Sequence, residues 1–210
     1  MHFYAFGSVC RGELDFLSDV DLLVVTRAGE ASLDAERFSI YSYSRLEELW
    51  REGNPFAWHL HLESRLLFAD DGVDYIAGLG RPRRYQNAGT DCERFARMFT
   101  ESAASLHDDR RIHVFDLSVM FLAIRNCATC YSLSDSATVP PTFSRHTALK
   151  LGDNSLEIDE RAYEVLFSAR ILSTRGIGLA PSGADVGRVL LAAEAVQSWL
   201  NRLVAQVRKQ

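Results

Sequence analysis

A glycine-serine pair and two nearby aspartates have residue types and a spacing that suit phosphate chemistry. Gly7 and Ser8 are followed by ten residues and then by Asp19 and Asp21, which lead into an apolar run. Glycine lets the backbone approach a phosphate closely, and a serine hydroxyl and backbone amides can donate hydrogen bonds to phosphate oxygens. We therefore expect Gly7 and Ser8 to form one half of a phosphate-binding site.

The two aspartates are expected to form the other half. Alternate residues of a β-strand point to the same side, so Asp19 and Asp21 should project together, while Val20 and Leu22 should enter the core. Two carboxylates on one side can bind a hard cation such as Mg²⁺ or Mn²⁺, which in turn bridges phosphate oxygens. A surface hairpin that carries two aspartates by chance is the alternative interpretation.

This arrangement resembles the signature of the DNA polymerase beta-like nucleotidyltransferase superfamily, in particular its small bacterial members that carry a helical C-terminal domain. The matching positions are Gly7, Ser8, Gly12, Ser18, Asp19, Val20, Asp21 and the apolar residues 22–25. The resemblance implies that Gly7, Ser8 and Ser18 hold a nucleoside triphosphate. It also implies that Asp19 and Asp21 hold the metal ion.

The third carboxylate that the resemblance implies is missing from its expected position. The best register places Ser39 there, and a serine cannot replace a carboxylate as a base or as an anionic ligand at neutral pH. Two other carboxylates could take its place, first Glu63 and then Glu36. Glu63 and Ser64 occupy the place of a Glu-Gly pair in the resembled proteins. Strand alternation would point Glu36 to the opposite face from Ser39.

The resemblance implies an enzyme that moves a nucleoside monophosphate from a nucleoside triphosphate to an acceptor hydroxyl and releases pyrophosphate. Its catalytic residues would be Asp19, Asp21 and Glu63. The acceptor stays open among a protein, a small molecule such as an antibiotic, and a nucleic acid end, as does assembly into a homodimer or with a partner protein. A protein or tRNA target would suit a toxin–antitoxin system. The alternative is a catalytically degenerate nucleotide-binding protein of regulatory or antitoxin type, which Ser39 favours.

Composition and charge indicate a globular protein of the cytoplasm. The 210 residues are 47% hydrophobic and 24% charged, and the formal net charge is -5, so no overall positive field attracts nucleic acid. We expect neither a signal peptide nor a membrane-spanning segment, because no apolar run approaches the roughly 20 residues that a span needs. Cys127 and Cys130 are predicted to be buried helix thiols rather than metal ligands.

The elements that must position the predicted site lie in the first third of the chain. Strands are predicted at residues 2–8, 19–27 and 36–44, a helix at 44–53, and a helix that runs into a strand across 58–72. From residue 90 onward the pattern is helical, with apolar residues at three- and four-residue spacing over residues 92–107, 115–133, 160–176 and 187–207. Gly176 is a predicted helix cap.

The predicted fold class is α+β, with a small mixed nucleotidyltransferase sheet and flanking helices followed by an antiparallel helical bundle. The domains are predicted as a nucleotidyltransferase domain at 1–75, a linker at 76–89 and a helical domain at 90–210. The linker is rich in Gly, Pro and Arg, which is typical of an exposed connection. Within it, residues 81–84 (Arg-Pro-Arg-Arg) are interpreted as a solvated loop in preference to a phosphate contact.

Overall fold

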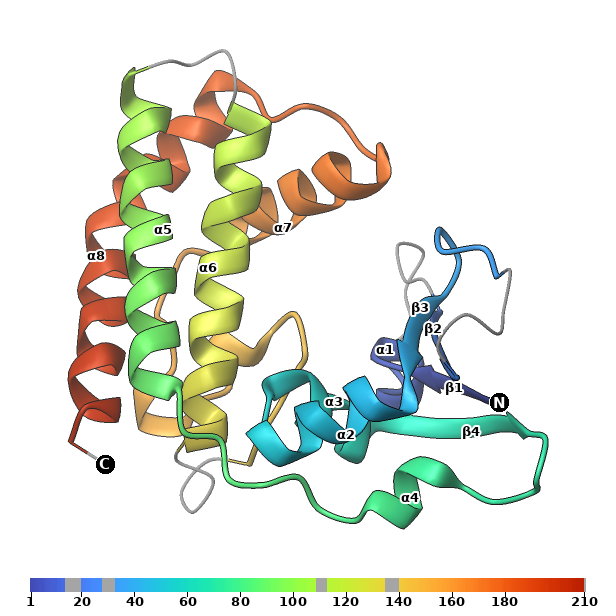
Figure 1. Cartoon of the computed structure of the whole chain (residues 1–210). Coiled ribbons are helices and arrows are strands. Elements are labelled where there is room, and N and C mark those ends of the chain that lie inside the picture. Colours follow the sequence, from blue (N-terminus) through green and yellow to red (C-terminus); the bar gives the residue numbers. More distant parts are fainter. Residues whose placement is uncertain (14–19, 28–32, 109–112, 135–139, 210) are drawn as a thin grey trace. The chain divides into compact units, whose positions relative to one another are not determined.

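The computed structural model describes residues 1–13, 20–27, 33–108, 113–134 and 140–209. The chain divides into two compact units, Met1–Gln86 and Asn87–Gln210, and Figure 1 shows the elements of each. The two units are described separately below.

The first unit is built on a mixed sheet of four strands with the order β3-β2-β1-β4. Strand β1 is antiparallel to both β2 and β4, whereas β3 lies parallel to β2. The strand bounds are β1 His2–Phe6, β2 Asp21–Thr26, β3 Ser39–Ser42 and β4 Ser64–Ala69. Every predicted strand is present, although β3 begins three residues later than predicted, after a turn at residues 35–37.

Capping residues set where the helices of the first unit begin. The side chains of Ser42, Asn54 and Asp74 each accept a hydrogen bond from a backbone N–H in the first turn of the helix that follows, as expected for N-cap residues. The predicted passage from a helix directly into a strand is confirmed at Glu63 and Ser64. The helix bounds are α1 Ser8–Arg11, α2 Tyr43–Glu52, α3 Pro55–Glu63 and α4 Tyr75–Leu79.

The core of the first unit lies between one face of the sheet and the helices α2, α3 and α4. It is formed by buried side chains from β1, β2 and these helices: Tyr4, Phe6, Leu23, Val25, Leu46, Leu49, Trp50, Ala57, Leu60 and Ile76. The Tyr4 hydroxyl donates to Asp74 Oδ1 over 3.0 Å and accepts from the Ile76 backbone N–H over 3.0 Å. This pair of bonds fixes the start of α4 to strand β1.

The face of β2 that enters this core differs from the prediction. Asp21 shares its side of the strand with the core residues Leu23 and Val25, whereas Val20 is 53% exposed and Leu22 is half-buried. Leu23, Val24 and Val25 are all fully buried, so both sides of the strand are covered in its middle. Alternation therefore could not identify the core side, and the expectation for Val20 and Leu22 was wrong.

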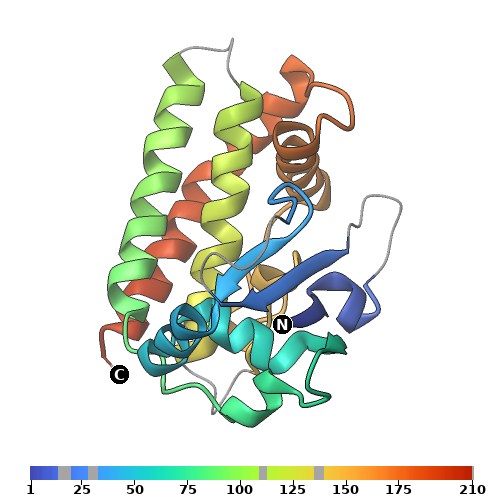
Figure 2. The same cartoon turned by 45° about the vertical axis from the view of Figure 1, so that its right-hand side comes forward.

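The second unit is helical. In Figures 1 and 2, α5, α6 and α8 lie side by side, and α5 runs opposite to the other two. Gly176 has φ +67° and caps α7, as predicted. The bounds are α5 Ala88–Asp108, α6 His113–Ser134, α7 Glu160–Arg175 and α8 Gly183–Val207, with short 3₁₀ turns at Thr147–Leu149 and Gly152–Asn154. The predicted α+β class is confirmed.

Helix α6 is the central helix of this unit. Cys127 and Cys130 lie within it as buried free thiols, as predicted. By length and composition the helix is also long and apolar enough to cross a membrane, but 67% of its most apolar stretch is buried. The expectation that no apolar stretch would reach that length was therefore wrong. Burial within the unit is typical of a core helix, which can have the same length and composition.

The predicted linker is divided between the two units. Its residues up to Gln86 belong to the first unit, and those from Asn87 belong to the second. It begins inside α4, where Ile76 is a core residue, and it ends inside α5, which starts at Ala88. The boundary between the compact units therefore lies later in the chain than the predicted domain end at residue 75.

Candidate active site

The carboxylate of Asp21 lies against the backbone of Gly7. Gly7 follows the last residue of β1, Phe6, which pairs with Asp21 in the neighbouring strand. The φ of Gly7 is +77°, and a Cβ at this position would lie 2.4 Å from Asp21 Oδ2. Glycine is therefore required twice, by its backbone conformation and by the close approach of the carboxylate. Gly7 of the glycine-serine pair and Asp21 thus meet at one end of the sheet.

The residues after Gly7 form a single helical turn. Ser8 is the first residue of α1, which ends at a left-handed Gly12 with φ +71°, and the Glu13 N–H donates to the Ser8 carbonyl over 3.1 Å. Ser18 and Asp19, which the sequence assigns to triphosphate and metal binding, lie outside the described residues. Among the residues that the structure describes, no group of three or more His, Cys, Asp or Glu side chains could hold a metal ion.

Ser39 lies on the same face of the sheet as Asp21. The parallel register pairs Ser39 with Leu23, and paired residues of neighbouring strands point to the same side, as do Leu23 and Asp21 on one strand. The side chain of Ser39 is exposed at the start of β3. Glu36 lies in the turn before this strand and is exposed, so the alternation argument used for it does not apply.

Glu63 lies at the same end of the sheet as Asp21. It is the last residue of α3, directly before Ser64. Ser64 pairs with Phe6 on one side of β1, and Asp21 pairs with Phe6 on the other. Asp21 and Ser64 therefore lie on the two strands that flank β1, and each of these strands is about 4.8 Å from β1.

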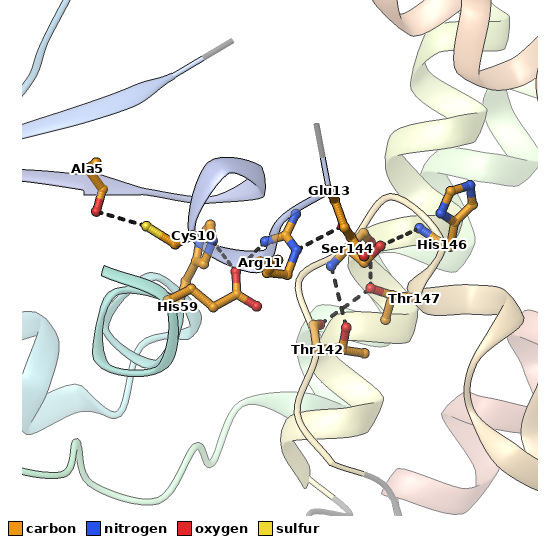
Figure 3. A network of polar contacts seen from close by, with 10 residues as sticks. Ala5, Cys10, Arg11, Glu13, His59, Thr142, Ser144, His146 and Thr147 are labelled. Atoms are coloured by element: carbon orange, nitrogen blue, oxygen red, sulfur yellow. Dashed lines mark hydrogen bonds and ion pairs between the residues drawn. The ribbon is translucent and has the colours of Figure 1, made fainter. Parts of the chain in front are cut away.

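An ion-pair network holds the Glu63 carboxylate. Arg11 Nη1 is ion-paired with Glu63 Oε2, and His59 Nε2 lies 3.0 Å from the same oxygen. Arg11 Nε also donates to Glu13 Oε2 over 2.9 Å. Figure 3 shows Arg11 between Glu13 and the carboxylate beside His59. The Glu63 side chain is only 11% exposed, so its negative charge is matched by a guanidinium group in a largely buried place.

Sequence reasoning missed Arg11. Burial lowers its pKa, but the hydrogen bonds and charges of Glu13 and Glu63 outweigh burial, and the net pKa is raised. The neighbouring Cys10 thiol donates to the Ala5 carbonyl over 3.4 Å, and burial raises its pKa despite the opposing charges of Arg65 and Arg11. A basic residue at the start of the spacer after the glycine-serine pair was the available signal. Its partner lies 52 residues away.

Comparison with known proteins identifies the first part of the chain. Residues 2–76 match the family described as Nucleotidyltransferase domain. The solved spectinomycin adenyltransferase AAD(9) from Enterococcus faecialis, with ATP and spectinomycin, is similar at 14% identity with a TM-score of 0.46, covering 96% of this chain and 91% of that chain. No curated protein matches at a significant level. The predicted resemblance is therefore confirmed, and residues 2–76 form a nucleotidyltransferase domain of the DNA polymerase beta-like superfamily.

Proposed function

We propose that this protein transfers a nucleoside monophosphate from a nucleoside triphosphate to an acceptor hydroxyl. The observation that carries the proposal is the contact between the Asp21 carboxylate and the backbone of Gly7. Gly7 belongs to the half that we assign to the triphosphate and Asp21 to the half that we assign to the metal ion, and both lie within residues that match the nucleotidyltransferase family. A chance surface hairpin has no reason to combine a glycine of positive φ with this close approach.

In the proposed site, Gly7, Ser8 and Ser18 hold the triphosphate, and Asp21 and Asp19 provide oxygen ligands for Mg²⁺ or Mn²⁺. Carboxylate oxygens are the donors that such hard cations prefer. When bound, the cation would neutralise the charge that builds on the transferred phosphoryl group and on the leaving pyrophosphate. The remainder of the catalysis is the positioning of the two reactants by the chain.

The acceptor oxygen forms a bond to the α-phosphorus, the bond from that phosphorus to the bridging oxygen breaks, and pyrophosphate leaves. The hydroxyl proton passes to a base, which we assign to Glu63. Arg11 holds this carboxylate in place, and His59 Nε2, 3.0 Å from Glu63 Oε2, is available to share the proton. The acceptor is a protein, a small molecule or a nucleic acid end in the cytoplasm.

The substitution Asp21→Asn tests the site. It keeps the shape of the side chain and removes the charge, so transfer should fall by about 10³-fold and Mg²⁺-dependent binding of a nonhydrolysable triphosphate analogue should be lost. Glu52→Gln, which removes an exposed charge from α2, serves as the control. Calorimetric titration and release of labelled pyrophosphate are the measurements. Unchanged Mg²⁺-dependent affinity in Asp21→Asn would refute the site.

The nucleotide-binding protein without turnover remains the second candidate, because Ser39 lies on the Asp21 face without a carboxylate. If no other base serves, Ser39→Asp should raise the transfer rate by about 10²- to 10⁴-fold, the usual worth of a positioned proton acceptor. Ser44→Asp adds the same charge at an exposed position of α2 and should leave the rate unchanged.

Two other outcomes separate the candidates. A lower rate in Ser39→Asp would mean that Glu63 or Glu36 already accepts the proton and is repelled by the added charge. Nucleotide binding without transfer in both the natural protein and Ser39→Asp would favour the regulatory protein.

A further inference from the structure

Two tryptophans fix the segment after α4. The indole N–H of Trp50 donates to the Gly80 carbonyl over 2.9 Å, and that of Trp58 donates to the Arg83 carbonyl over 3.0 Å. The Arg83 N–H in turn donates to the Trp50 carbonyl over 3.0 Å. Residues 80–83, whose composition predicts an exposed linker, are therefore hydrogen-bonded to α2 and α3.

The same segment also packs against Gly53, at the end of α2. A Cβ on Gly53 would lie 2.4 Å from the Arg83 carbonyl oxygen and 2.6 Å from that of Arg84, so the two backbones are in direct contact. Pro82 and Tyr85 are buried, whereas the arginines between and beside them are exposed. The backbone of this segment is therefore held in place by its buried residues, and the arginine side chains extend from fixed Cα positions.

These arginines surround a pocket of about 300 Å³ in the first unit. It is lined by Glu47, Trp50, Arg51, Leu79, Arg81 and Arg83, and we call it the arginine pocket. Within the described part of the chain, Arg51, Arg81 and Arg83 have no carboxylate partner. The lining acid, Glu47, accepts a hydrogen bond from the Tyr75 hydroxyl over 2.8 Å. The lining therefore carries an excess of positive charge that the protein does not neutralise.

One of the arginines is also held by an aromatic ring. Arg81 Cζ lies 5.0 Å from the centre of the Trp58 ring, a cation–π distance. Burial, and then the positive charge of Arg81, lower the pKa of the nearby His61. His61 packs edge-on against the same tryptophan, with ring centres 6.0 Å apart.

We propose that the arginine pocket binds a phosphate group, at a site distinct from the nucleotide site of Gly7 and Asp21. A guanidinium group presents paired N–H donors that match phosphate oxygens, and a backbone that is already fixed loses little conformational freedom on binding. The volume accommodates one or two phosphate groups. The phosphate belongs either to a small compound or to the backbone of a nucleic acid strand.

Titration of the full-length protein with pyrophosphate, and separately with a short single-stranded oligonucleotide, tests the proposal. Both are performed in EDTA, so that metal-dependent binding at the nucleotide site does not contribute. Arg51→Gln and Arg83→Gln should each weaken binding about tenfold, because a charge-assisted hydrogen bond is lost. Arg202→Gln removes an exposed arginine from α8 and should have no effect, and Asp21→Asn should also bind normally.

The outcomes identify the ligand or overturn the site. Arginine-dependent binding of pyrophosphate alone assigns the pocket to small phosphate compounds. Arginine-dependent binding of the oligonucleotide, with a salt dependence that becomes less steep in each pocket variant, assigns it to a nucleic acid strand. Absence of metal-independent binding, equal loss in Arg202→Gln, or loss in Asp21→Asn would each overturn the proposal. Circular dichroism confirms that each variant is folded.

Discussion

Two glycines of the first unit both have a positive φ but differ in their surroundings. Gly7 has φ +77° and Gly53 has φ +65°, and a Cβ on either would lie 2.4 Å from an oxygen atom. At Gly7 the oxygen belongs to the Asp21 side chain, which can turn away. At Gly53 it belongs to the backbone carbonyl of Arg83, and the carbonyl of Arg84 is at 2.6 Å.

The difference separates a functional close approach from a structural one. A substitution at Gly7 can be relieved by moving the Asp21 carboxylate, so the fold survives and the proposed metal ligand is displaced. A substitution at Gly53 can be relieved only by separating α2 from the segment that carries Arg83. We therefore expect the first to damage activity and the second to damage stability.

The largest expected effect is that of Gly53→Ala. We expect a loss of about 3 to 5 kcal/mol in the free energy of unfolding of the first unit, from the left-handed backbone and the clash with two carbonyl groups. Urea denaturation followed by circular dichroism measures it. Gly12→Ala is the matched control, because Gly12 lies in the same unit and also caps a helix in the left-handed conformation, at φ +71°, but has no atom within 4 Å of its Cβ position. An equal loss in both variants would show that the clash is unimportant.

Gly7→Ala should act mainly on transfer. Displacement of a reacting group by about 1 Å can cost about 10²-fold in rate, and we expect a fall of that size. The positive φ with an extended ψ at Gly7 should also cost about 1 to 3 kcal/mol of stability. Gly80→Ala has a similar conformational cost, because Gly80 has φ +66° and ψ -152° against +77° and -143° for Gly7, but it has no atom near its Cβ position. Pyrophosphate release is measured for both. If Gly80→Ala reduces transfer as strongly as Gly7→Ala, the contact with Asp21 is not the cause.

The smallest expected effect concerns pH. Burial and then Arg81 lower the pKa of His61 in the folded protein below its ordinary value of 6.5. The unfolded chain therefore takes up the proton first as pH falls, so this contribution to stability is complete above about pH 6.5 and decreases as pH falls toward the folded pKa. His61→Gln should reduce the loss of stability between pH 7.5 and 5.5, measured by urea denaturation. The control is His107→Gln on α5. An unchanged pH dependence in His61→Gln would contradict the assignment.

The sequence by itself determined the order of the elements and the start of the site. Local signals were sufficient for the strand that leads into Gly7, the helix cap at Gly176, and the apolar strand that begins at Asp21. Each depends on residues that are close in sequence and on backbone preferences that act over one turn or one strand. The glycine-serine pair and the Asp-x-Asp motif could be recognised for the same reason.

Only the tertiary structure decided which distant groups meet. Glu63 was predicted as a catalytic residue, but its pairing with Arg11 joins residues 52 positions apart, and no local pattern encodes such a contact. The same holds for the segment 80–84. Gly, Pro and Arg give a flexible linker in water and a fixed arginine-bearing segment when Trp50 and Trp58 bond to its carbonyls. Composition describes the side chains alone, whereas the hydrogen bonds of the backbone depend on what the fold places beside it.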